Sequence, residues 1–180
     1  MENANLIWID CEMTGLSLER DALVEIAVLV TDSQLNILGD GVEIVISCSD
    51  EALAAMSEVV RTMHTESGLL PLIKSGKTIT EAEDAVLQYL NAHTSSGKSP
   101  LAGNSVWMDR NFIMRDMPRL SEWLHYRTVD VTSIKELARR WYPKVFFSAP
   151  KKTGNHRALG DIKDSIEELK YYRAAIFNAS

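Results

Sequence analysis

The sequence predicts an α/β fold with a mixed central β-sheet, whose opening strands are antiparallel and whose faces are flanked by α-helices. Two observations support this prediction. Runs rich in Val and Ile come first and are separated by short polar turns, as neighbouring antiparallel strands are. Brief strands then alternate with helices up to a long amphipathic helix near the end of the sequence, and such alternation is typical of α/β proteins.

The opening part of the chain is predicted to supply three strands. Leu6–Asp10 is an apolar run that ends in an acid and opens into a turn, as a buried strand does. Val24–Thr31 and Val42–Ser47 are rich in Val and Ile, and Asn36 and the stretch 39–41 (Gly-Asp-Gly) lie between them. We therefore expect these two runs to be antiparallel neighbours.

Helices are predicted for the middle of the chain. Glu51–Val60 and Glu66–Lys74 are expected to be short helices, and Thr80–Asn91 a longer one. Thr80 is its predicted N-cap, with Glu83 at the third helical position of a capping box.

The remaining sequence alternates strands and helices. Its predicted elements are a loop at Thr94–Pro100, a strand at Leu101–Gly103, a helix at Asp109–Met117 stopped by Pro118, a strand at Thr128–Val131, a helix at Ile134–Trp141 that ends at Pro143, a mobile loop at Lys144–Asn155, and one long helix at Ala158–Phe177.

Length and composition restrict the function. A chain of 180 residues, 46% of them hydrophobic, suits a single domain over residues 1–180. Its net charge of -6 argues against a nonspecific nucleic-acid coat protein, which is normally basic. Cys11 and Cys48 lack the spacing of a zinc knuckle or a disulfide framework, so we expect the protein to be located in a reducing cytoplasm. Asp10 and Glu12 interrupt the first apolar run, and no signal or membrane-spanning segment is expected.

Four acids and one histidine are the candidate catalytic residues. Asp10 and Glu12 lie two apart on a predicted strand, so their side chains share a face, where a shared proton or a bound cation would relieve their repulsion. Asp109 and Asp161 lie near helix starts and could point to the same sheet edge. His156 suits a general base, because an imidazole with a pKa near neutrality can accept a proton from an attacking water. Each residue alone also has an ordinary interpretation as a solvated strand end or a helix-start group.

Taken together, these residues resemble the DEDDh exonuclease family, which has the RNase H-like fold. The matching pattern is Asp10-x-Glu12, Asp109 after the turn at 103–105, and His156 followed five positions later by Asp161. Segments 8–16, 64–69, 125–127, 135–141 and 154–158 resemble the oligoribonuclease branch of that family, and most of all its actinobacterial members.

The resemblance implies a cofactor and a reaction. Asp10, Glu12, Asp109 and Asp161 would hold two divalent cations, Mg²⁺ or Mn²⁺, and hard carboxylate oxygens do select such ions. His156 would be the general base. The implied reaction removes nucleotides from the 3′ end of short RNAs and releases 5′-mononucleotides.

The resemblance also implies how a short substrate is held. Leu16 would be a wedge between two bases, and His64 would lie near the 3′ nucleotide. Ser105, Arg127 and Thr132 would form a cap that reads the 5′ phosphate, a role that suits Arg because its fork donates two hydrogen bonds to phosphate oxygens. Such a cap would favour dinucleotides, linear pGpG among them.

A homodimer is the expected active form, because the resemblance implies that Tyr126 and Arg127 reach into the site of a partner subunit. Aromatic clusters at 141–142, 146–147 and 171–172 are typical of interfaces and equally of cores. Trp107, Met108 and Val59 depart from the family pattern near the predicted site, which leaves substrate entry and base stacking open.

Two other functions stay open at this point. The first is a DEDDh exonuclease that acts on longer RNA or DNA, which the length dependence of cleavage would distinguish. The second is a noncatalytic module that binds short nucleotides. Retention of a repulsive carboxylate cluster argues against the second, because a site without catalysis has no reason to keep it.

Overall fold

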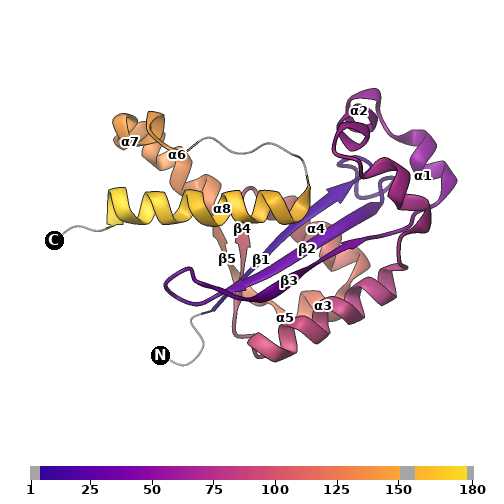
Figure 1. Ribbon diagram of the computed structural model, residues 1–180, viewed down its shortest axis with the longest axis horizontal. Coiled ribbons are helices and arrows are strands. Elements are labelled where there is room, and N and C mark those ends of the chain that lie inside the picture. The colour runs from indigo at the N-terminus through magenta and orange to yellow at the C-terminus, as the bar shows by residue number, and fades with distance from the viewer. Residues whose placement is uncertain (1–4, 151–156, 178–180) are drawn as a thin grey trace.

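The computed structural model describes residues 5–150 and 157–177, and its centre is a five-stranded mixed sheet (Figure 1). The strand order is β3-β2-β1-β4-β5. Strand β1 (Leu6–Met13) is antiparallel to β2 (Leu23–Thr31), which is antiparallel to β3 (Ile37–Val45). On its other side β1 is parallel to β4 (Pro100–Gly103), which is parallel to β5 (His125–Asp130). The predicted mixed sheet with antiparallel opening strands is confirmed.

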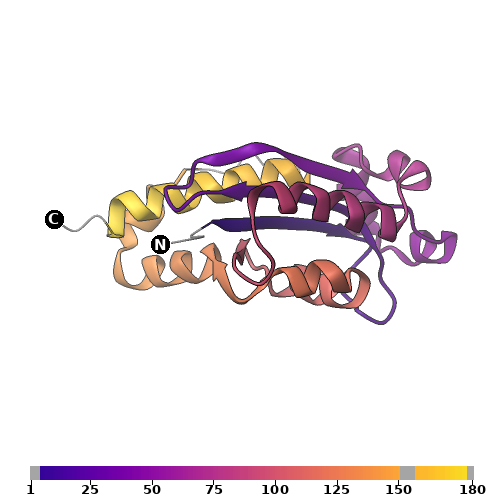
Figure 2. The ribbon, with the colours of Figure 1, turned by 90° about the horizontal axis from the view of Figure 1, so that it is seen from below.

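One face of the sheet packs against three helices. These are α3 (Ile79–His93), α4 (Trp107–Asp116) and α5 (Pro118–Trp123). Their apolar side chains form one core with the alternate β1 residues from Ile7 to Met13. Figure 2 shows α4 and α5 on the opposite side of β1 from the last long helix, drawn in yellow.

The other face packs against α6 (Val131–Trp141) and α8 (Ala158–Tyr172) in a second core that includes Trp8. Successive side chains of a strand point to opposite faces, so Asp10 and Glu12 share the face of Trp8. The alternation of β1 therefore directs both acids toward α8.

The N-cap of α3 is Thr78, so the predicted cap at Thr80 is wrong. The Thr78 hydroxyl accepts a hydrogen bond from the Glu81 N–H at 3.2 Å, and the Glu81 carboxylate accepts one from the Thr78 N–H at 2.8 Å. Glu83, the predicted capping partner, is buried inside α3, where its carboxylate pairs with Arg119 at 2.8 Å.

Two serine caps divide the region predicted as the helix Glu51–Val60. Ser49 caps α1 (Asp50–Ala55), and Ser57 caps α2 (Glu58–Glu66), because each hydroxyl accepts a hydrogen bond from an N–H of the first turn. The predicted helix Glu66–Lys74 is in fact the end of α2 followed by the 3-10 helix η1 (Leu70–Ser75).

Strand β3 begins before the glycines that were expected to separate two strands. Gly39 and Gly41 lie inside it with φ of 71° and 76°, a conformation that glycine adopts without steric cost. The reversal of the chain occurs earlier, where the Asp32 side chain accepts hydrogen bonds from the N–H groups of Gln34 and Asn36.

Prolines begin helices here as well as ending them. Pro118 stops α4 as predicted and also opens α5. Pro143 opens α7 (Pro143–Phe147), a helix in the region expected to be a loop. Proline is tolerated at these positions because an N–H in the first turn of a helix has no helical partner to lose. The predicted last helix ends in a π-helical turn, η2 (Arg173–Phe177). In the described part of the chain, no helix combines the length and apolar character that crossing a membrane requires.

Candidate active site

Three carboxylates meet where β1 passes the first turn of α8. Asp10 and Glu12 come from β1, and Asp161 comes from α8. One carboxylate oxygen of each lies within 4.8 Å of the others. Oxygen ligands at this spacing suit a hard divalent cation such as Mg²⁺ or Mn²⁺. Three of the four acids predicted from the sequence are therefore brought together; we call them the acid cluster.

Asp109, the fourth predicted acid, reaches the same strand from the opposite face of the sheet. It lies in the first turn of α4, and its Oδ1 accepts a hydrogen bond from the Cys11 N–H at 2.9 Å. β4 pairs with β1 only at Ile7 and Trp8. The Cys11 N–H lies beyond these pairs on β1, and Asp109 accepts its hydrogen bond there. Its carboxylate is outside the group of three mutually close acids but lies near enough to Glu12 to raise the pKa of that residue.

The electrostatics of the acid cluster favour a bound cation. Burial raises the pKa of Glu12 to about 8, helped by the negative charges of Glu25, Asp161 and Asp109 and opposed by Arg157. Burial also raises the pKa of Asp109 to about 6, against the hydrogen bond from Cys11. Carboxylates held this close must keep a proton or share a cation, so these residues fit the divalent ions that the resemblance implies.

His64, a predicted substrate contact, lies beside Glu12 of the acid cluster. It belongs to α2 and is fully buried, with Nε2 2.8 Å from the carbonyl oxygen of Met13. A carbonyl only accepts hydrogen bonds, so Nε2 carries the proton. The other ring nitrogen, Nδ1, faces Oε2 of Glu12 at 3.9 Å.

Ser105 and Thr132, two predicted cap residues, are brought together by Asp130. The Asp130 carboxylate accepts hydrogen bonds from the N–H groups of Ser105 at 3.0 Å and Thr132 at 2.9 Å. The two hydroxyl oxygens are 3.1 Å apart. Ser105 has a φ of 55°, a left-handed conformation that the Asp130 hydrogen bond helps to hold.

The other predicted substrate contacts are on the surface. The Arg127 guanidinium lies 5.3 Å from the ring centre of Tyr126 on the edge strand β5, and Tyr126 is 73% exposed. Leu16 is largely exposed in the turn after β1, where it lines a pocket of about 480 Å³ together with Arg20 and Val60. Trp107 and Val59, the expected departures from the family pattern, are also largely exposed.

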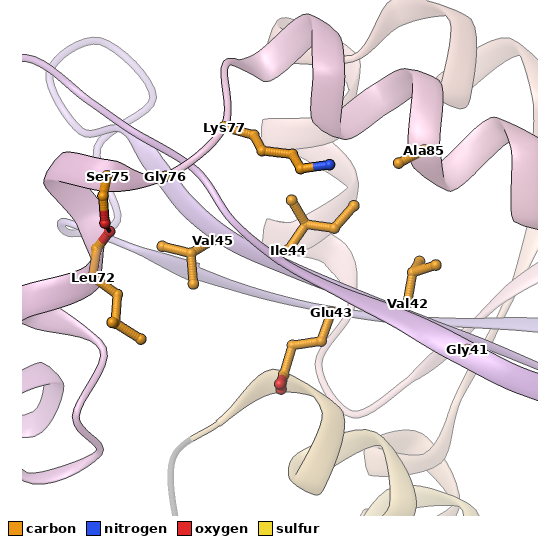
Figure 3. Close-up of a pocket in the computed structure, with 10 residues that line it drawn as sticks. All are labelled: Gly41, Val42, Glu43, Ile44, Val45, Leu72, Ser75, Gly76, Lys77 and Ala85. Carbon is orange, nitrogen blue, oxygen red and sulfur yellow. Dashed lines mark hydrogen bonds between the residues drawn. The ribbon is translucent and has the colours of Figure 1, made fainter.

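A second pocket, of about 620 Å³, runs along the outer edge of β3 (Figure 3). Gly41 to Val45 line it, together with Leu72 and Lys77. The Glu43 side chain points from this strand toward the start of α8, where its Oε1 accepts a hydrogen bond from the Leu159 N–H at 3.1 Å (Figure 3).

An ion-pair network at the start of α8 was not predicted from the sequence. Glu25 on β2 is completely buried, and its Oε1 accepts hydrogen bonds from Nε of Arg157 at 3.0 Å and from Nη2 at 2.7 Å. Its Oε2 accepts one from the Ala158 N–H at 3.2 Å. The sequence did contain a signal for this network, because Glu25 is an acid inside the otherwise apolar run of β2.

The predicted general base, His156, lies outside the described residues, directly before Arg157 in the sequence.

Comparison with known proteins identifies the family. An exonuclease family model (RNase_T) matches residues 7–169. The oligoribonuclease of Streptomyces avermitilis is 61% identical over 176 residues, which are 97% of this chain and 88% of the relative. The oligoribonucleases of Rhodococcus jostii and Cutibacterium acnes are 59% and 54% identical, over 96% and 95% of this chain and 87% and 85% of theirs.

Solved structures agree on the fold. Escherichia coli exonuclease I in complex with single-stranded DNA matches with a TM-score of 0.75 and 13% identity, over 98% of this chain and 42% of that one. Exonuclease I of Methylocaldum szegediense matches with a TM-score of 0.68 and 18% identity, over 97% of this chain and 41% of that one. The present chain thus spans about two fifths of these enzymes, and the likeness confirms the RNase H-like fold. The relatives and the family model show that the chain belongs to the oligoribonuclease family of exonucleases and is a 3′–5′ exoribonuclease.

Proposed function

We propose that the chain, as a single exonuclease domain, degrades very short RNAs from the 3′ end, prefers dinucleotides such as linear pGpG, and releases 5′-mononucleotides. The observation that carries this proposal is the acid cluster of Asp10, Glu12 and Asp161 in a chain with oligoribonuclease relatives. The name of those relatives supports short RNA as the substrate class.

The proposed cofactors are two divalent cations, Mg²⁺ or Mn²⁺. The acid cluster would hold them together with Asp109, whose Oδ1 accepts a hydrogen bond from the Cys11 N–H. When bound, the cations would supply an activated water and stabilise the leaving 3′ oxygen. Support comes from the raised pKa of Glu12, which is caused first by burial and then by the neighbouring carboxylates, and which Arg157 opposes.

His156 is the proposed general base. Its role would be to accept the proton of the attacking water, a task for which an imidazole has a suitable pKa. Although His156 is outside the described residues, it precedes Arg157, whose ion pairs tie the start of α8 to the sheet. Asp161 lies four residues further on, in the same first turn.

We propose that a few contacts hold the substrate, because a net charge of -6 does not favour binding along many phosphates. Leu16 would be the wedge between two bases, and His64 would contact the 3′ nucleotide. The cap on the 5′ phosphate would consist of the Ser105 and Thr132 hydroxyls and the Arg127 guanidinium. Support for the cap comes from the convergence of these two hydroxyls.

The active form is proposed to be a homodimer in the cytoplasm. Tyr126 and Arg127 are exposed on the edge strand β5, from which they would reach a partner's site. Trp141, Tyr142 and Phe147 add exposed aromatic surface, which is enriched at interfaces. Both cysteines are unpaired, which suits a reducing compartment.

A time course of cleavage tests the proposal. RNAs of two to about twenty nucleotides, labelled at the 5′ end, are incubated with Mg²⁺, with Mn²⁺ or with a chelator. We expect the dinucleotide to disappear far faster than the longer chains and only with metal. Equal trimming of long chains would refute the dinucleotide preference. Binding of dinucleotides with no cleavage under any of these conditions would refute the catalytic role.

A further inference from the structure

Among the described residues, the first turn of α8 is held by side chains of the neighbouring strands and not by its N-cap residue. Arg157 is the N-cap residue, and its side chain makes no capping hydrogen bond. The N–H groups of Ala158 and Leu159 donate instead to the carboxylates of Glu25 at 3.2 Å and Glu43 at 3.1 Å. Carboxylates are favoured at this end of a helix by its dipole, so the sheet determines where α8 begins.

Arg157 links the backbone of α8 to the same two acids. Its guanidinium pairs with Glu25 at 2.7 Å and with Glu43 at 3.5 Å. Its carbonyl oxygen accepts the hydrogen bond of the Asp161 N–H at 3.0 Å. Asp161, a member of the acid cluster, is therefore one helical turn away from a residue that is fixed by a buried carboxylate.

Glu25 also lies directly across from the acid cluster. It is the register partner of Glu12 in the antiparallel pair of β1 and β2. Both of its carboxylate oxygens accept hydrogen bonds, Oε1 from Arg157 and Oε2 from both the Ala158 N–H and Nε of Arg157. Glu25 thus holds Arg157 and the start of α8, and the Arg157 guanidinium lies near enough to Glu12 to oppose the rise in the pKa of that carboxyl.

We propose that Glu25, through Arg157, is a positioning residue that holds Asp161 of α8 and Glu12 of β1 in the arrangement needed to bind a divalent cation. This inference rests on the proposed function, in which the acid cluster is the cation site. A residue that orients metal ligands without touching the metal typically changes metal affinity by roughly 10- to 100-fold when it is replaced.

A second buried glutamate provides a matched control on the other face of the sheet. Glu83 accepts hydrogen bonds from Nε of Arg119 at 2.8 Å and from the Leu120 N–H at 3.0 Å, near the start of α5. It thus has the same two kinds of partner as Glu25, an arginine and a first-turn N–H. Helix α3, which carries Glu83, packs on the face of the sheet opposite α8 and contains no member of the acid cluster.

The test compares Glu25→Gln with Glu83→Gln in the full chain. Mn²⁺ affinity is measured by calorimetry without RNA, thermal unfolding is measured in chelator, and kcat and KM are measured on a dinucleotide. We expect both variants to unfold at lower temperatures than the wild type. Only Glu25→Gln should lose Mn²⁺ affinity, by roughly 10-fold or more, and its kcat should fall more than its KM rises.

A Glu25→Gln variant that loses stability but binds Mn²⁺ as tightly as the wild type would overturn the proposal. If that variant does not fold, Arg157→Lys replaces it, because lysine keeps the charge but not the two-pronged contact. Arg157→Lys should weaken Mn²⁺ binding, and unchanged affinity would overturn the proposal. A wild type that binds Mn²⁺ without cleaving dinucleotides would refute the proposed function, while the affinity comparison would still decide the role of Glu25.

Discussion

Glu12 and Glu25 are direct register partners on neighbouring antiparallel strands, and their side chains share the face of the sheet that α8 covers. Like charges in this position repel each other. Arg157 neutralises Glu25 through a partly buried ion pair. Burial raises the pKa of Glu12, and the nearby charge of Glu25 adds to this rise.

The metal-free protein is predicted to lose stability as the pH rises. The pKa of Glu12 is raised from 4.5 to about 8 in the folded chain. Between these values the unfolded chain has released this proton and the folded chain keeps it, so raising the pH favours unfolding. The melting temperature in chelator should fall between about pH 5 and about pH 8, measured by circular dichroism.

The control for this prediction is Glu12→Gln, which removes the titrating group. Its melting temperature should depend less on pH over the same range, and identical slopes in both proteins would contradict the assignment to Glu12. Added Mn²⁺ should stabilise the wild type more at about pH 8 than at about pH 6, because the ligand must lose its proton to bind.

Asp161→Asn is predicted to lose activity while it gains stability without metal. Removing one negative charge from the acid cluster weakens the repulsion in the folded state, and it also removes a cation ligand. We expect kcat on a dinucleotide to fall by at least about 100-fold and the melting temperature in chelator to rise. Glu167→Gln, on an exposed part of the same helix, should change neither.

The role of His156 is predicted to be separable from metal binding. His156→Ala should lower kcat on a dinucleotide by roughly 100- to 10,000-fold, the usual contribution of a general base. Its Mn²⁺ affinity, measured by calorimetry, should stay at the wild-type value, because the carboxylate ligands are intact. A parallel loss of Mn²⁺ affinity would instead indicate that His156 supports the metal site.

Arg127→Ala is predicted to affect only substrates that carry a 5′ phosphate. Loss of a charge-assisted hydrogen bond should lower kcat/KM on phosphorylated dinucleotides by about 10-fold or more, with little effect on dinucleotides that lack this phosphate. Arg139→Ala, an exposed arginine on α6, is the control and should leave both substrates unaffected. Equal losses on both substrates would argue against the phosphate cap.

Local patterns predicted the opening strands and the shared face of Asp10 and Glu12, and predicted the helix starts less well. The chain offers two capping boxes in the same region, Thr78 with Glu81 and Thr80 with Glu83, and both satisfy the local rule. The structure uses the first, because Glu83 is needed elsewhere to pair with Arg119 and the start of α5. A contact between distant segments therefore decided between two locally equivalent alternatives.

The sequence by itself determined that Asp10 and Glu12 share a face, because the period of a strand is two and depends on nothing beyond the strand. It also determined the family, through segments spread along the whole chain.

Only the tertiary structure decided which side chains join Asp10 and Glu12. Asp161 arrives on α8, and Asp109 reaches the strand from the other face. Glu25 and Arg157 are 132 positions apart, and such pairing follows from how sheet and helix pack rather than from any local period.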